Sequence, residues 1–188
     1  MSRLKLATWS PHVNAVNAPP ALRAWLTAPG SLTAQLIAHS QQFRVRRIRQ
    51  ATGLILADEQ EALHIPRRVL VQQRNVVLEC DGTPVVFAHT SVPLSATATD
   101  WPLFGSLGER SLGSTLFGDK LVQRGVLEFA RLSQRHTLVQ RLEKALGRQS
   151  EQTLFARRCV YRRRHGVLLV SEIFLPNIVA LALQSNAA

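Results

Sequence analysis

Hydrophobic side chains in the middle of the chain form two runs that flank a turn signal. The runs cover residues 69–80 and 83–92, with Asp81-Gly82 between them and Pro93 after the second run. An Asp-Gly pair favours the two-residue turn of a β-hairpin, and proline ends a strand because it has no backbone N–H to donate. The pattern predicts a hairpin of two antiparallel strands.

Two further segments show the composition of strands. Residues 43–56 are rich in β-branched and long side chains, interrupted by Gly53. Residues 160–175 indicate a second hairpin that turns at His165-Gly166, and Pro176 follows it.

Helical periodicity marks other parts of the chain. Residues 21–27 follow two prolines and predict a short helix, and Ser31 then caps a second helix with an apolar face. Leucines at positions 138, 142 and 146 predict an amphipathic helix that ends at Gly147. Residues 121–132 fit a strand and a helical face equally well, so periodicity leaves this segment open.

Length and composition indicate one globular domain. The chain has 188 residues, of which 46% are hydrophobic, enough to build a core. Its longest apolar runs, 167–170 and 178–183, are far shorter than the roughly 20 residues that cross a bilayer. Residues 1–10 lack the apolar core of a secretory signal, and Cys80 and Cys159 have no disulfide-framework or zinc spacing. We expect a cytoplasmic protein with reduced cysteines and no transmembrane segment.

The chain is strongly basic, with 23 lysines and arginines, 12 acidic residues and a formal net charge of +11. This charge attracts small dicarboxylates as readily as it attracts phosphates. Nucleic-acid binding favours exposed aromatic side chains among basic ones, yet the sequence has a single tyrosine and most phenylalanines lie inside apolar runs. We therefore expect no nucleic-acid partner.

Motifs for several common chemistries are absent from the sequence. There is no GxSxG, GxxxxGK[ST], GxGxxG or HExxH motif. The six histidines are scattered without the spacing of metal ligands. These absences disfavour hydrolysis by a serine triad or by zinc.

Side-chain alternation in the central hairpin places a cation on an apolar face. If Cys80 pairs with Thr83 across the turn, the register sets Leu78 opposite Val85, Val76 opposite Phe87 and Arg74 opposite His89. An arginine on such a face either extends to the sheet edge, pairs within the protein, or holds an anion in a pocket. The pattern leaves these alternatives open.

Glu172 presents the same question in the last predicted strand. A carboxylate in an apolar strand is costly to bury without a partner. Across the second turn its partner is Cys159 or, with a register shift of two residues, Arg157. Pairing with Arg157 implies a structural ion pair, whereas pairing with Cys159 leaves a buried acid available for chemistry.

Four sequence blocks carry a resemblance to a known family. They are RNVVLECDGTP at 74–84, HTSVP at 89–93, LGERSLG at 107–113 followed by Leu116-Phe117, and LLVSEIFLP at 168–176. In order and spacing these blocks resemble the chorismate pyruvate-lyases. The resemblance covers residues 20–178, with 1–19 as an N-terminal extension of a single domain.

This resemblance implies an α+β fold: a six-stranded antiparallel sheet with helices packed on one side and helical flaps over an enclosed ligand site. The implied reaction removes pyruvate from chorismate and leaves 4-hydroxybenzoate, the first committed step toward ubiquinone. The family implies no metal or organic cofactor. We expect chorismate and 4-hydroxybenzoate as the small-molecule partners, and a monomeric protein.

The same resemblance assigns roles to individual residues. Arg74 matches the arginine that grips the ring carboxylate, and Glu172 the carboxylate near the ring 4-hydroxyl. Leu112 matches a residue whose backbone contacts the ligand from the flap. Leu32 stands where a methionine lines the pocket, a change that conserves volume. His89, a further candidate for ligand binding, stands where the pattern has arginine.

Two further expectations follow from the comparison with the family pattern. The resemblance makes residues 121–132 a strand, and the stretch 136–152, which looks longer than in compact members, is interpreted as a surface addition.

An alternative function is a non-catalytic module that senses small aromatic acids, because ligand domains of some bacterial winged-helix repressors resemble this fold. Only about twenty residues precede the matched core, so we expect the enzyme rather than the sensor.

Overall fold

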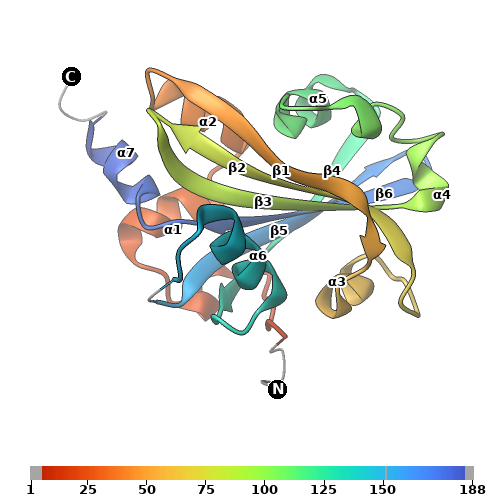
Figure 1. Cartoon of the computed structure of the whole chain (residues 1–188), viewed down its shortest axis with the longest axis horizontal. Coiled ribbons are helices and arrows are strands. Elements are labelled where there is room, and N and C mark those ends of the chain that lie inside the picture. Colours follow the sequence, from red (N-terminus) through yellow and green to blue (C-terminus); the bar gives the residue numbers. More distant parts are fainter. Residues whose placement is uncertain (1–5, 151, 185–188) are drawn as a thin grey trace.

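Six antiparallel strands form one continuous sheet in the computed structural model, which describes residues 6–150 and 152–184. The spatial order is β1-β2-β3-β6-β5-β4 (Figure 1). The strands are β1 Phe43–Leu54, β2 Leu70–Cys80, β3 Thr83–Pro93, β4 Val122–Leu132, β5 Leu154–Arg163 and β6 Gly166–Phe174. The predicted α+β class and both hairpins are confirmed, and the segment that periodicity left open is a strand.

Both hairpins close with tight turns in which residues adopt positive φ. Asp81 and Gly82 have φ of 50° and 75°, as a two-residue turn with Asp-Gly requires. In the second hairpin Arg163 pairs with Gly166, so the turn lies at Arg164-His165, one residue before the predicted position. This register sets Arg157 opposite Glu172, which decides between the two alternatives left by the sequence.

The predicted register of the central hairpin is wrong beyond the turn. Glu79 pairs with Pro84 but Leu78 pairs with Val86, so one residue of β3 bulges out of the ladder. A bulge inserts one residue into one strand and moves every later side chain of that strand to the other face. Arg74 is therefore opposite Thr90, and His89 is opposite Asn75.

Short helices cover the sheet face that carries Arg74, called the Arg74 face below. These are α1 Pro20–Thr27, α2 Leu32–Ala38, α5 Leu112–Gly118 and α7 Ile178–Gln184. Apolar side chains of α1, α2 and α7 pack with Val76, Leu78 and Ala88 in one buried cluster. A neighbouring cluster under α4 Leu94–Thr97, the 3₁₀ helix Phe104–Ser106 and α5 extends this layer.

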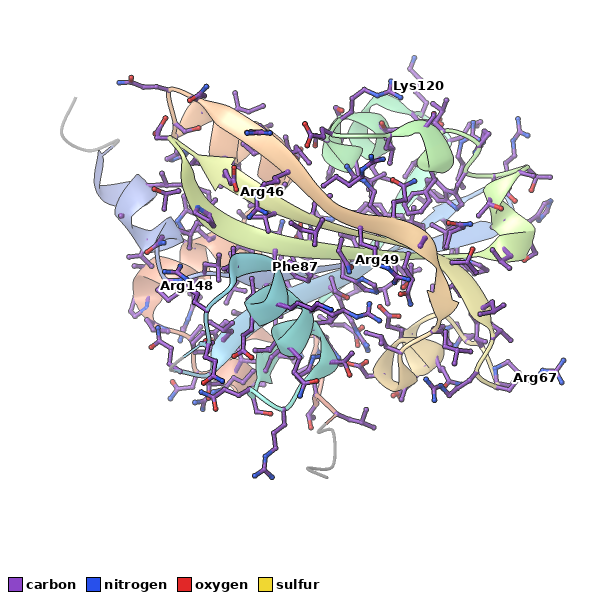
Figure 2. The ribbon with its side chains drawn as sticks, in the orientation of Figure 1. Arg46, Arg49, Arg67, Phe87, Lys120 and Arg148 are labelled. Carbon is purple, nitrogen blue, oxygen red and sulfur yellow. The ribbon has the colours of Figure 1, made fainter. Side chains whose placement is uncertain are left out.

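The expectation of helices on one side only is wrong, because the opposite face, called the His89 face, is also covered. Helices α3 Ala57–Ala62 and α6 Thr137–Leu146 lie on it (Figure 1). Leu138, Val139 and Leu142 of α6 pack against a buried group that includes Phe87, labelled in Figure 2, and Ile173. The strands carry apolar side chains on both faces of the sheet, so helices must cover both faces. Helix α6 is thus part of the core, which corrects its interpretation as a surface addition.

The segment before residue 20 is attached to the sheet. Ser10 and Phe129 exchange two backbone hydrogen bonds of 2.9 and 2.7 Å, and a 3₁₀ helix follows at Val13–Val16. Val16 and Ala18 are buried in the cluster on the Arg74 face. Residues 1–5 of the expected extension lie outside the described residues.

Basic side chains are distributed around the molecule. Arg46, Arg67, Lys120 and Arg148 lie on different sides of it (Figure 2). None of the helices in residues 6–150 and 152–184 is long and apolar enough to cross a membrane.

Replacement of Leu142 tests whether α6 is part of the core. Leu142 is 1% exposed, so Leu142→Ala leaves a cavity and should lower the free energy of unfolding by about 2 to 5 kcal/mol. The exposed Lys144 of the same helix is the control, and Lys144→Ala should change stability by less than about 0.5 kcal/mol. Equal and small effects of both variants in chemical denaturation would return α6 to the status of a surface addition.

Candidate active site

A cavity lies between the Arg74 face and the flap formed by residues 30–33 and 111–117. Strands β1, β2, β3, β5 and β6 supply its floor, and α2 and α5 supply its roof. The lining residues are Gly30, Leu32, Thr33, Val45, Arg74, Val76, Leu78, Ala88, Thr90, Ser111, Leu112, Gly113, Leu116, Phe117, Arg157, Tyr161, Val170 and Glu172. Four of the five residues selected from the sequence therefore meet here: Arg74, Glu172, Leu112 and Leu32.

Arg74 is a buried cation without an acidic partner among the described residues. Its side chain belongs to a residue only 2% exposed, and its Nη2 donates to the carbonyl oxygens of Gly108 (3.1 Å) and Arg110 (2.8 Å). The Nε atom is buried and has no hydrogen-bond partner. Burial, and then the charge of Arg47, lower the pKa of Arg74 to about 10. The guanidinium is unsatisfied, so the site favours a bound anion.

Glu172 forms the ion pair with Arg157 that one of the two predicted registers implies, and it also borders the cavity. Its Oε2 accepts from Nε of Arg157 at 2.5 Å, and it also lines the cavity. Arg157 in turn donates through Nη1 to the carbonyl oxygens of Trp25 (3.3 Å), Leu26 (3.2 Å) and Ala28 (3.4 Å) at the end of α1. The ion pair fixes the carboxylate in the cavity wall and ties α1 to the sheet.

A hydrogen bond joins the two parts of the flap, α2 and the residue that precedes α5. Thr33 and Ser111 share a hydrogen bond of 2.7 Å, and the hydroxyl of Ser111 also accepts from the backbone N–H of Gly113 (3.1 Å). A Cβ on Gly113 would lie 2.9 Å from Oγ1 of Thr33, so any larger residue here would force Thr33 to shift. Leu32 and Leu112 thereby face the same cavity from the two helices.

His89 does not join the other predicted site residues. The bulge in β3 places it on the His89 face, where it is fully buried. Its Nδ1 lies 2.5 Å from Oδ1 of Asn75, and its Nε2 lies 3.0 Å from Oε1 of Glu59 and 3.1 Å from Oγ of Ser91. The sheet itself separates this polar network from the cavity.

Sequence reasoning missed Thr90 and Tyr161 in the cavity wall. The predicted register put Thr90 on the wrong face, and the second hairpin was predicted to begin only at residue 160. Tyr161 shares its face with Arg157 by simple alternation along β5. A strand predicted from residue 154 would have identified it.

Comparison with solved structures defines the class of fold. The effector domain of PhnF from Mycobacterium smegmatis matches with a TM-score of 0.53 at 16% identity, covering 79% of this chain and 90% of that domain. A GntR-family transcriptional regulator from Bacillus cereus matches with a TM-score of 0.55 at 13% identity, covering 73% of this chain and 94% of that one. These likenesses establish a shared sheet-and-helix architecture.

Sequence comparison identifies the family within that class. The chorismate lyase family model matches residues 3–182. A probable chorismate pyruvate-lyase of Cupriavidus metallidurans is 45% identical over 188 residues, covering 99% of this chain and 87% of that protein. Another from Dechloromonas aromatica is 41% identical over 178 residues, covering 95% and 99%. The chain belongs to the chorismate lyase family, which confirms the resemblance and extends it beyond residues 20–178.

Metal-ligating side chains do not cluster in the part of the chain that the structure describes. No group of three or more His, Cys, Asp or Glu residues there could hold an ion. That the reaction needs no cofactor stays a prediction.

The Arg157–Glu172 pair should be strongly coupled in stability. Arg157 and Glu172 side chains are 3% and 19% exposed, and removing one partner of a buried pair costs about 3 to 5 kcal/mol. Arg157→Met should therefore destabilise the protein by that amount, and the double variant Arg157→Met with Glu172→Gln by less than the sum of the single changes. The more exposed Arg46–Glu79 pair is the control, with an expected cost near 1 kcal/mol or less for Arg46→Met. Additive losses in urea denaturation would show that the pair is not coupled.

Proposed function

We propose that the cavity on the Arg74 face is the active site at which this chain removes pyruvate from chorismate and leaves 4-hydroxybenzoate. One observation carries the assignment: Arg74 is a buried guanidinium with a free Nε and no carboxylate partner among the described residues. It lies in a largely apolar cavity that also holds the carboxylate of Glu172. Membership of the chorismate lyase family supplies a substrate that fits this arrangement, a ring with a carboxylate at one end and a hydroxyl at the other.

The two charged groups define an axis for the ring. Arg74 lies on β2, and Glu172 lies two strands away on β6, on the same face of the sheet. The ring carboxylate pairs with Arg74 through charge-assisted hydrogen bonds, and the hydroxyl on C4 donates to the carboxylate of Glu172. Leu112 contacts the ligand from the flap, Leu32 from α2, and apolar side chains such as Val76 contact the ring.

The reaction requires little from the protein besides orientation and exclusion of water. Loss of the proton on C4 and cleavage of the bond between C3 and the ether oxygen make the ring aromatic, which drives the elimination. The electron pair of that bond leaves with the ether oxygen, and the released enolpyruvate takes a proton on its methylene carbon to become pyruvate. Fixed charges in a closed cavity favour this step because they need no reorganisation as charge develops.

Other properties expected from the sequence complete the proposal. We expect a monomer in the cytoplasm, without a nucleic-acid partner, which supplies 4-hydroxybenzoate as the first committed intermediate toward ubiquinone. These remain predictions for direct measurement.

The activity assay has two products to follow. The purified protein, mixed with chorismate and no added metal, should release pyruvate and 4-hydroxybenzoate in equal amounts, measured by coupled pyruvate reduction and by chromatography. A protein that binds chorismate and returns it unchanged would instead be the sensing module of the same fold.

Replacement of Arg74 tests the ligand site. Arg74→Ala leaves the ring carboxylate desolvated and unpaired, a loss of about 2 to 5 kcal/mol in binding. This corresponds to a product affinity lower by roughly 30-fold to several thousand-fold. Arg74→Lys should restore only part of it, because an ammonium lacks the planar fork that matches a carboxylate. Calorimetry with 4-hydroxybenzoate measures the change, and unaltered affinity in Arg74→Ala would disprove the assignment.

A further inference from the structure

A polar side chain on β5 borders the cavity without forming a hydrogen bond to a described residue. Tyr161 is 7% exposed and lines the cavity, and its hydroxyl forms no hydrogen bond with any residue that the structure describes. By contrast, Arg157 and Glu172 are paired, and Thr33 is bonded to Ser111. A buried tyrosine hydroxyl usually has a hydrogen-bond partner. An oxygen of the ligand would supply it here.

Tyr161 lies on the side of the cavity where the leaving group must be, if the proposed function is correct. Tyr161 lies on the same face of β5 as Arg157, four residues further along the strand. In the β5–β6 ladder Arg157 pairs with Glu172 and Tyr161 pairs with Leu168. The ring hydroxyl at Glu172 is on C4, and the enolpyruvyl ether is on the adjacent C3. The ether oxygen therefore lies near the β5–β6 side of the cavity, away from Arg74 on β2.

The surroundings of Tyr161 favour a fixed ring and a nearby anion. Its ring meets the ring of Phe117 edge to face, with centroids 6.4 Å apart and planes at 82°. Arg124 pairs with Tyr161 in the β4–β5 ladder, and its Cζ lies 5.7 Å from the centroid of Phe117. The Nε of Arg124 is buried without a hydrogen-bond partner. The enolpyruvyl group carries the second carboxylate of chorismate, which this cation attracts.

The hydroxyl of Tyr161 remains a donor at neutral pH. Burial, and then the charge of Glu172, raise the pKa of Tyr161 above its usual value. A protonated phenol in the cavity wall can donate a hydrogen bond to an oxygen of the ligand.

We propose that Tyr161 is a further catalytic residue, whose hydroxyl donates a hydrogen bond to the ether oxygen of chorismate as the C3–O bond breaks. The electron pair of that bond moves onto the ether oxygen, and the bond from Tyr161 stabilises the developing enolate. Tyr161 keeps its own proton throughout. The proton lost from C4 balances the one gained by the methylene carbon of pyruvate. The contact is made to a group that 4-hydroxybenzoate lacks, so it acts on turnover and not on product binding.

Tyr161→Phe removes only the hydroxyl and is the first test. The turnover number for chorismate should fall about 100-fold, the loss typical when one donor to a developing oxyanion is removed. The dissociation constant of 4-hydroxybenzoate should change by less than about twofold, because the free product makes no contact with this hydroxyl. The thermal midpoint should be unchanged, since the hydroxyl bonds nothing in the described protein. Unchanged turnover would overturn the proposal, and so would equal losses in turnover and product affinity.

A binding experiment tests the same contact without catalysis. The probe is 3-methoxy-4-hydroxybenzoate, which places an ether oxygen on C3, compared with 4-hydroxybenzoate. Tyr161→Phe should weaken binding of the methoxy compound by about fivefold more than binding of the parent compound, as expected for one hydrogen bond. An unchanged ratio of the two affinities would count against the proposal.

Thr90 provides a matched control at the other end of the ring. Its buried hydroxyl also forms no hydrogen bond with a described residue, but it lies opposite Arg74 on β3. Thr90→Val should change the affinities for the two benzoates by the same factor. If Thr90→Val changed the ratio of the two affinities and Tyr161→Phe did not, the C3 substituent would lie near Thr90, which would contradict the proposal. Because binding needs no turnover, this comparison tests the contact between Tyr161 and an oxygen on C3 separately from the proposed lyase activity.

Discussion

A charge buried under the helical layer must have a partner, and the guanidinium of Arg74 meets this requirement only in part. The carbonyl oxygens of Gly108 and Arg110 accept from its Nη2, while its Nε has no acceptor among the described residues. Carbonyl oxygens supply partial charge but no full negative charge. The guanidinium of Arg74 is therefore the group around which the cavity, the flap and the proposed ligand axis are organised.

The second buried guanidinium on this face is satisfied in a different way. Arg157 is held by Glu172 and by three carbonyl oxygens at the end of α1. The positive charge of Arg157 is therefore neutralised by Glu172 within the protein. Arg74 is the arginine of the cavity lining that has no acidic partner among the described residues. Arg157 contacts only Oε2 of Glu172, which leaves Oε1 for the ligand contact of the proposed function.

The two faces of the sheet separate two polar systems that are close in sequence. Thr90 faces the cavity, while His89 and Ser91 face a buried network with Glu59 on the opposite side. Apolar clusters surround both systems, so an unpaired charge is costly in either of them. The network on the His89 face joins α3 to the sheet through the buried carboxylate of Glu59, while the cavity on the Arg74 face is lined by Arg74, whose Nε has no partner among the described residues.

The sequence determined the features that depend on neighbouring residues. Alternation and the Asp81-Gly82 turn predict the central hairpin, and four of the five selected site residues line one cavity.

Tertiary structure decided the rest. A bulge in β3 reversed the face of His89, because a single extra residue in a ladder shifts all side chains beyond it. The register of β5 on β6, which joins Arg157 to Glu172 and brings Tyr161 into the cavity, depends on where a turn closes. Packing against two apolar faces made α6 part of the core, since only the assembled sheet shows how much surface needs cover.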